Sequence, residues 1–250
     1  MAAIDIERRE ALDAAAGGFA KRRYVRSVFS EIAPRYDLLN HLLSFNVDRR
    51  WRRRAIDALR WERDPTGTYL DVCAGTLDVS AELARRPGFG GTVLAADFAE
   101  PMLRRGLSKV RGAAVCPLVG DALELPVAAG RVAGVIVAFG VRNFDDLDAG
   151  LAELHRALAP GARLVILDFS RPRLALVRTM YNVYFHAVLP RVGALVSGHR
   201  TAYRYLPASV ASFPGPAALA RRMEDAGFAQ VGFRTLTLGI AAIHWGERAA

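Results

Sequence analysis

The sequence predicts an α/β fold, in which helices cover both faces of an open and mostly parallel β-sheet. One observation is that short apolar runs alternate with amphipathic segments, the pattern of successive βαβ units. A second is the tight turn at residues 71–78, which joins the first predicted strand to a helix. A third is Asp97, which ends the next strand and lies 21 residues after Thr76. Because Rossmann-like sheets hold ribose hydroxyls with a carboxylate at about this spacing, the three features predict a nucleoside pocket.

The predicted elements follow one another in the order that parallel strands joined by helices require. Apolar runs predict strands at residues 69–72, 92–96, 115–119, 132–139 and 163–169. Helices are expected at residues 79–86 and 102–110, and a third one begins after Asp145 or Asp146, either of which can cap it. Since right-handed crossovers bring the carboxyl ends of parallel strands to one edge, the ligand-binding residues are expected at that edge.

Both ends of the chain add further elements. Residues 1–64 predict an amino-terminal helical extension, and residues 65–250 form the main domain. Within it, the apolar and aromatic segment at about residues 171–215 is interrupted by prolines, and we expect it to fold over the pocket as a lid. A helical hairpin packed on the core is the alternative interpretation. The closing residues predict a helix and two strands, at 219–227, 231–237 and 240–244.

Composition excludes several classes of protein. The longest uninterrupted apolar stretch, residues 132–141, is shorter than the roughly 18 residues of a membrane span. Charged residues at positions 5–10 occupy the place of a signal peptide's apolar core, so a cytoplasmic protein is expected. Cys73 and Cys116 indicate neither a disulfide framework nor a zinc site, so no metal is expected. The net charge of +9, almost all from arginine, attracts acidic ligands, nucleic acid or anionic membranes, or is simply a solvated surface.

The turn at residues 71–78 indicates a ligand without phosphates. Only Gly75 is glycine, and the carboxylates of Asp71 and Asp78 flank the turn where a pyrophosphate would require a positive field. S-adenosylmethionine fits better, because it carries ribose and adenine together with a cationic sulfonium that carboxylates attract. We therefore expect Asp71, Gly75, Thr76 and Asp97 to bind this cofactor. The alternative interpretation of the same residues is a strand-turn-helix connection with a purely structural role.

Several blocks of sequence resemble one family. They are VFSEIAPRYDLLNHLLSFN at residues 28–46, AFGVRN at 138–143, LDFSRP at 167–172 and YRYLPAS at 203–209. The chain resembles the C-methyltransferases that complete menaquinone and ubiquinone, and the resemblance extends from about residue 24 to 246. It implies a class I S-adenosylmethionine-dependent methyltransferase domain with a seven-stranded, Rossmann-like sheet. The sequences LSFN at residues 43–46 and DVC at 71–73 are more similar to the menaquinone branch of the family.

The resemblance also assigns cofactor contacts. They fall on Thr76, Asp97 and the pair Asp121 and Ala122 after the third strand. Ala138 stands where some relatives have a serine, so a side-chain hydrogen bond is lost there. Leu77 stands where the family usually has a small residue. A left-handed backbone would cost leucine roughly 1 to 2 kcal/mol, so we expect Leu77 to be right-handed and the pocket to bind cofactor nonetheless.

Methylation of a ring carbon requires an electron-rich acceptor, which a quinol becomes when a hydroxyl loses its proton. Arg142 and Asn143 follow the fourth strand, where the acceptor meets the methyl group in this fold. We predict that Arg142 stabilises the oxyanion and that Asn143 orients it. In the alternative, Arg142 pairs with Asp145 or Asp146 at the helix cap. The residues predicted to contact substrate are Tyr36, Asn40, Tyr203 and Tyr205.

The predicted partner is a prenylated quinol, with demethylmenaquinol preferred over a benzoquinol. Since such a quinol lives in the bilayer, we expect transient contact with the inner membrane face, through the lid and the arginine cluster around Trp51. Weaker candidates for a general base are His41, His186, His199 and His244. No Tyr-x-x-x-Lys pair or Asn/Asp-Pro-Pro-aromatic motif supports a nicotinamide enzyme or a nucleic-acid methyltransferase. A non-catalytic scaffold that binds S-adenosylmethionine, and a homo-oligomer, both stay open.

Overall fold

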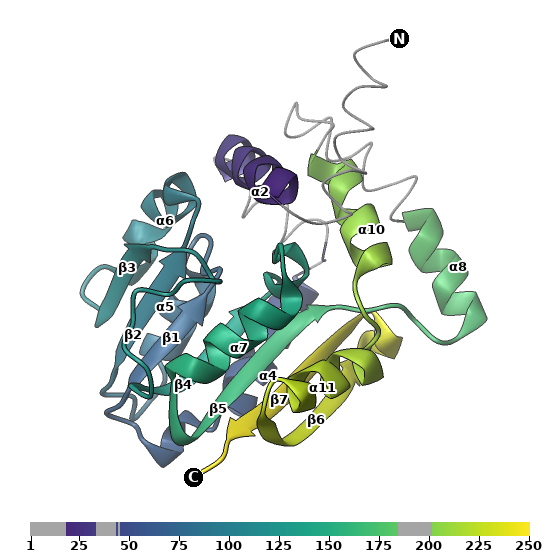
Figure 1. Cartoon of the computed structure of the whole chain (residues 1–250). Helices are drawn as coiled ribbons and strands as arrows, with labels where there is room; N and C mark the ends of the chain where they lie inside the picture. Colours follow the sequence, from purple (N-terminus) through teal and green to yellow (C-terminus); the bar gives the residue numbers. More distant parts are fainter. Residues whose placement is uncertain (1–18, 34–43, 45, 185–201) are drawn as a thin grey trace.

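The computed structural model describes residues 19–33, 44, 46–184 and 202–250, and its centre is a seven-stranded sheet (Figure 1). The strand order is β3-β2-β1-β4-β5-β7-β6. The strands are β1 (Thr68–Val72), β2 (Thr92–Asp97), β3 (Val115–Val119), β4 (Val132–Ala138), β5 (Leu158–Phe169), β6 (Phe228–Leu236) and β7 (Ala241–Arg248). β1 to β5 are parallel, and β7 is antiparallel to both β5 and β6. The predicted fold class is therefore confirmed.

Alternate side chains of the central strands point to opposite faces of the sheet and meet different helices. In β4, Val135 and Val137 belong to one core, together with α7 (Leu147–Ala157) and α11 (Pro216–Asp225). Ile136 belongs to the other core, with α4 (Val47–Leu59) and α5 (Asp78–Ala84). Because both faces of the strand are covered, it is apolar throughout, as the sequence run 132–138 indicates.

Helix α4 belongs to the predicted amino-terminal extension, yet it supplies core side chains to the sheet. Trp51, Ala55 and Ile56 are buried against β4 and β5. Trp51 also lies 6.2 Å from the rings of both Phe139 and Phe169, centroid to centroid. Trp51, at the centre of the predicted arginine cluster, is 5% exposed and is therefore a core residue, whereas contact of the surrounding arginines with a membrane stays a prediction.

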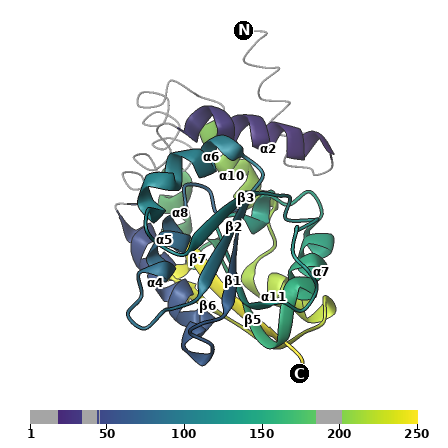
Figure 2. The ribbon, with the colours of Figure 1, turned by 90° about the vertical axis from the view of Figure 1, so that its left-hand side faces the viewer.

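The remaining helices gather at the carboxyl edge of the parallel strands. They are α2 (Phe19–Ile32), α6 (Glu100–Gly106), α8 (Ala175–Val183) and α10 (Ala202–Ser212). Elsewhere the described chain also forms short 3₁₀ helices, which are η2 (Trp61–Arg63), η3 (Leu107–Val110), η4 (Val141–Asn143) and η6 (Thr237–Gly239). Figure 2 shows α2 lying across this edge, beside α6 and α10. From β1 the chain adds β2 and β3 on one side and then returns to add β4 and β5 on the other side, so the order of strands reverses between β1 and β4. In open α/β sheets, ligands bind at such a switch point.

Two of these helices come from the predicted lid segment. α8 and α10 lie on either side of residues that the structure does not describe, and Tyr205 of α10 packs on Val25 of α2. Within the described part of the chain, no helix has both the length and the hydropathy needed to cross a membrane.

Candidate active site

A pocket opens at the carboxyl edge, between the loops that follow the first four strands. Its lining includes Cys73 after β1, Asp121 and Ala122 after β3, Asn143 after β4, and Arg22 from α2. The sequence predicted Asp121, Ala122 and Asn143 as functional residues, and the structure brings these three to one cavity. They lie together because β3, β2, β1 and β4 are successive parallel neighbours in the sheet, so the loops after these strands end at the same edge.

Asp97 joins the turn after β1 to the loop after β2. One oxygen of its carboxylate accepts a hydrogen bond from the Gly75 amide at 2.8 Å, and the other accepts one from the Ala99 amide at 2.8 Å. Burial raises the pKa of Asp97 to about 6, and the two backbone donors oppose that rise. Gly75 has a φ of +53°, which suits glycine and turns its N–H toward Asp97. A carboxylate accepts about four hydrogen bonds, so acceptor positions are left for a ligand.

Asp71 has a different environment from the one predicted for a cofactor-binding residue. Its carboxylate is 1% exposed and accepts hydrogen bonds from the Ser80 amide at 3.1 Å and the Ser80 hydroxyl at 2.6 Å. Burial raises the pKa of Asp71 to about 7, although the Ser80 hydrogen bonds favour the charged form. The structure therefore directs Asp71 to helix α5 and does not bring its carboxylate to the pocket lining.

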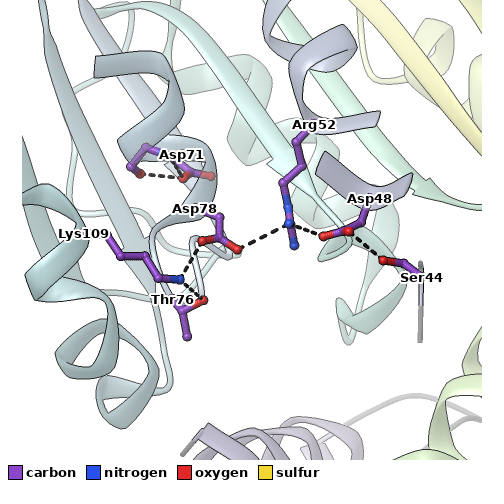
Figure 3. Close-up of polar contacts among 8 residues, drawn as sticks. Ser44, Asp48, Arg52, Asp71, Thr76, Asp78 and Lys109 are labelled. Atoms are coloured by element: carbon purple, nitrogen blue, oxygen red, sulfur yellow. Dashed lines mark hydrogen bonds and ion pairs between the residues drawn. The ribbon is translucent and has the colours of Figure 1, made fainter. Parts of the chain in front are cut away.

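Asp78, the second carboxylate of the turn, takes part in a chain of ion pairs (Figure 3). Arg52 of α4 lies between Asp48 at 2.5 Å and Asp78 at 3.3 Å. Lys109 approaches Asp78 at 2.6 Å and also donates to the Thr76 hydroxyl at 3.1 Å. The expectation that Asp78 attracts a sulfonium is therefore wrong, because the protein's own cations neutralise that carboxylate. The chain of contacts instead holds Thr76 in place.

Sequence reasoning missed Lys109 and Lys21 as site residues. They are the chain's only lysines among 34 basic residues, and both contact the loops of the site. Lys21 of α2 donates to the Phe144 carbonyl at 2.6 Å, and burial lowers its pKa. The neighbouring Arg22 forms an ion pair with Asp121 at the pocket. The rarity of lysine in an arginine-rich chain was the available signal.

The structure overturns the expectation for Leu77. Its φ is +65°, so the backbone is left-handed. The side chain is fully buried with Ala81 and Leu103, and burying a leucine contributes about 1.5 to 3 kcal/mol, which offsets the left-handed strain of about 1 to 2 kcal/mol. A Cβ at Gly106 would lie 2.7 Å from the Leu77 Cγ and 2.4 Å from the Thr76 carbonyl oxygen. Glycine at 106 therefore provides the space that the leucine occupies.

On the acceptor side, Arg142 is buried and paired with a carboxylate from the next strand. Its Nη1 lies 2.8 Å from the Asp168 Oδ1, and its backbone amide donates to the Asp168 Oδ2 at 3.2 Å. The guanidinium lies 5.5 Å from the centroid of the Phe169 ring. The alternative that Arg142 pairs with an aspartate at the helix cap is wrong. Asp146 caps α7 alone, by accepting from the Asp148 and Ala149 amides at 3.0 Å each.

Asn143 and Tyr205 are brought together. The Tyr205 hydroxyl donates to the Asn143 Oδ1 at 3.2 Å, and the Tyr205 side chain is 3% exposed. Since that oxygen accepts from tyrosine, the amide nitrogen of Asn143 is left as a donor toward the pocket. Tyr205 thus orients Asn143, and its hydroxyl is not directed into open space as a substrate contact would be.

Other predicted residues are not brought to the pocket by the described structure. Tyr36 and Asn40 lie outside the described residues, and so does the side chain of Tyr203, although its backbone is part of α10. Ala138 packs in the core beneath α4. Of the candidate bases, His244 is buried against the Pro216 carbonyl, and burial lowers its pKa to about 4. That histidine is therefore a neutral packing residue.

Comparison with known proteins gives a consistent picture. The model of the ubiE/COQ5 methyltransferase family matches residues 18–248. A demethylmenaquinone methyltransferase from Thermus thermophilus is 51% identical over 223 residues, which are 88% of this chain and 100% of that protein. A protein of the same name from Deinococcus radiodurans is 44% identical over 91% of this chain and 94% of its own. A ubiquinone/menaquinone biosynthesis C-methyltransferase from Geobacter sulfurreducens is 42% identical, with coverages of 91% and 90%.

Solved structures agree on the fold. A S-adenosylmethionine-dependent methyltransferase from Thermotoga maritima matches with a TM-score of 0.64 at 15% identity, over 89% of this chain and 98% of that one. A Haemonchus contortus phosphoethanolamine N-methyltransferase with S-adenosylmethionine bound matches with a TM-score of 0.58 at 15% identity, over 78% of this chain and 52% of the other. These likenesses confirm the class I methyltransferase fold.

Proposed function

The chain belongs to the ubiE/COQ5 methyltransferase family, and from this premise we propose that it transfers a methyl group from S-adenosylmethionine to a ring carbon of demethylmenaquinol. The names of the relatives from T. thermophilus and D. radiodurans support this substrate. The observation that carries the proposal is that Asp121 and Ala122, predicted for the cofactor, and Asn143, predicted for the acceptor, line one shared pocket.

The residues that line the pocket, together with Asp97 and Thr76 in the adjoining loops, fit S-adenosylmethionine. Asp97 is held by the Gly75 and Ala99 amides and has acceptor positions left for two ribose hydroxyls. We assign Asp121 and Ala122, which line the pocket, to contacts with the same cofactor. When bound, the cofactor supplies an electrophilic methyl group on its sulfonium. Thr76, tied to Lys109, keeps the turn in the conformation that the cofactor meets.

On the acceptor side, the protein has to favour the quinolate. We propose that the Arg142 guanidinium, kept in place by Asp168 and the Phe169 ring, stabilises the negative charge on the oxygen that loses its proton. The Asn143 amide, oriented by Tyr205, donates a hydrogen bond to a quinol oxygen. Tyr36, Asn40 and Tyr203 stay proposed substrate contacts.

The prenyl tail holds the substrate in the bilayer, so we propose that the enzyme works at the inner surface of the membrane. A second candidate substrate is the benzoquinol precursor of ubiquinone, because the name of the G. sulfurreducens relative covers both quinones.

The test is transfer of labelled methyl from S-adenosylmethionine to demethylated quinols kept reduced. Demethylmenaquinol should become labelled at a ring carbon, and the benzoquinol more slowly. A faster reaction of the benzoquinol would transfer the assignment to the ubiquinone pathway. Cofactor binding without labelling of either ring would contradict the enzymatic proposal and favour the scaffold.

A further inference from the structure

Helix α8 carries an apolar ridge that faces away from the protein. Leu176 is 74% exposed, Met180 65% and Val183 57%, and the spacing of four and three residues places them on one side of the helix. Leu174, which precedes the helix, is 59% exposed. No residue of α8 is buried, and Figure 1 shows the helix standing apart from the sheet. Large hydrophobic side chains grouped in this way on a surface indicate a docking site.

The segment of sequence that contains this ridge is rich in positive charge. Between residues 169 and 223 the sequence contains eight arginines and no aspartate or glutamate. Arg171, Arg173 and Arg178 lie directly before or within α8, and all three are exposed. Arginine can extend its charged end toward lipid headgroups while its alkyl stem stays with apolar neighbours. Arg171 and Arg173 lie at the end of the helix where the ridge begins, whereas Arg178 is on the opposite side of α8. An apolar ridge with arginines at one end is the arrangement of a helix that lies in the interface of an anionic membrane.

The other side of α8 is directed toward the acceptor site. The helix follows β5, whose end carries Asp168. Tyr181 lies on the side opposite to Leu176 and Val183. Its pKa is raised mainly by burial, and Arg142 and Asp168 are among the charges that act on it. One short helix therefore separates the predicted position of the quinol ring from an exposed apolar surface.

We propose that α8 docks the protein on an anionic lipid bilayer, with Leu176, Met180 and Val183 among the acyl chains and the neighbouring arginines at the headgroups. The inference deepens the proposed function and rests on it, since a substrate with a polar ring and a prenyl tail has to reach the site from the membrane. It assigns to α8 the membrane contact that the sequence predicts for the lid segment at residues 171–215.

The experiment is flotation of the full chain with vesicles of phosphatidylglycerol and phosphatidylcholine, compared with phosphatidylcholine alone. The wild type should float with the anionic vesicles at low salt and lose binding as salt rises. The variant Leu176→Glu/Met180→Glu should bind at least about tenfold more weakly. Replacing Arg173, at the end of the ridge, with glutamine should weaken binding roughly fivefold. The matched control is Leu107→Glu, which charges another exposed apolar side chain on η3 and should float like the wild type.

Three results would overturn the proposal. In the first, the wild type does not float with anionic vesicles. In the second, the double glutamate variant floats as well as the wild type. In the third, the wild type is a dimer that the double variant converts to a monomer, because the ridge would then be a contact between two copies of the chain. Methyl transfer to a short-tailed quinol without vesicles separates this inference from the proposed function. If docking through α8 is right, the double variant's rate on vesicle-borne quinol falls relative to its rate on the short-tailed one. If instead the wild type floats but methylates neither quinol, only the proposed function fails.

Discussion

The turn at residues 73–78 and helix α8 both follow a strand at the carboxyl edge of the sheet, but their environments are opposite. In the turn, Thr76 and Leu77 are buried, and Gly75 and Asp78 are held by Asp97, Arg52 and Lys109. In α8 no residue is buried and the apolar side chains are exposed. The difference indicates that the cofactor side is preorganised by hydrogen bonds, whereas the acceptor side leaves surface to be covered when a second component arrives.

The largest expected effect tests the preorganised side. Asp97→Asn removes the charge that we assign to the ribose, and one oxygen that accepts a backbone hydrogen bond. Since each hydrogen bond to a charged group contributes about 1.5 to 3 kcal/mol, calorimetry should show S-adenosylmethionine binding weakened roughly ten- to hundredfold per lost bond. Asp71→Asn is the matched control, because Asp71 is as deeply buried but bonded to Ser80. Equal weakening by both variants would mean that Asp71 acts on the cofactor as well.

A somewhat smaller effect is expected on the acceptor side. Arg142→Lys keeps the positive charge beside Asp168 and removes the planar guanidinium. We expect kcat to fall roughly tenfold or more, with cofactor affinity unchanged, because the charge acts on the quinolate. Arg142→Ala is the harsher variant, since it leaves the Asp168 charge buried without its arginine and destabilises the fold as well. A loss of cofactor affinity without a fall in turnover per bound cofactor would contradict the assignment.

Leu77 tests how the turn tolerates its own strain. Leu77→Gly relieves the left-handed backbone but empties the space beside Gly106, so the free energy of unfolding should fall by about 1 to 3 kcal/mol. Leu77→Ala retains the strained φ and loses most of the same packing, so it should be the less stable of the two. Urea denaturation of the three proteins measures this, and a glycine variant more stable than wild type would show that strain outweighs burial.

The last prediction concerns the pH dependence of stability. The pKa of Asp71 is about 7 in the folded protein and near 3.8 when exposed, so the folded state binds more protons between these values. Stability from this group is therefore greatest at low pH and falls by about 1 kcal/mol per unit as pH rises toward 7. Asp71→Asn cannot titrate but retains an acceptor for Ser80, so its urea midpoint should depend less steeply on pH. Parallel curves for the two proteins from pH 5 to 7 would contradict this account of Asp71.

Local patterns in the sequence predicted much of the fold. The apolar runs became strands with boundaries within a few residues, and the aspartate before the leucine-rich helix became its cap, as Asp146. These features depend on neighbours along the chain, because strand alternation and capping hydrogen bonds join residues a few positions apart. The spacing from Thr76 to Asp97 was predictive for the same reason, since one βαβ unit has a nearly constant length.

The sequence by itself determined the class of sheet, the edge where ligands bind, and the residue types that meet there. Only the tertiary structure decided which partner each charge has. Arg142 forms its ion pair with Asp168 and not with the nearby Asp145, because β4 and β5 are neighbours in the sheet. Asp78 forms ion pairs with Arg52, which lies 26 positions before it in the chain, and with Lys109, which lies 31 positions after it. Leu77 became left-handed because the core around Gly106 received its side chain. In each case the free energy comes from burial and pairing between distant segments, which no local pattern records.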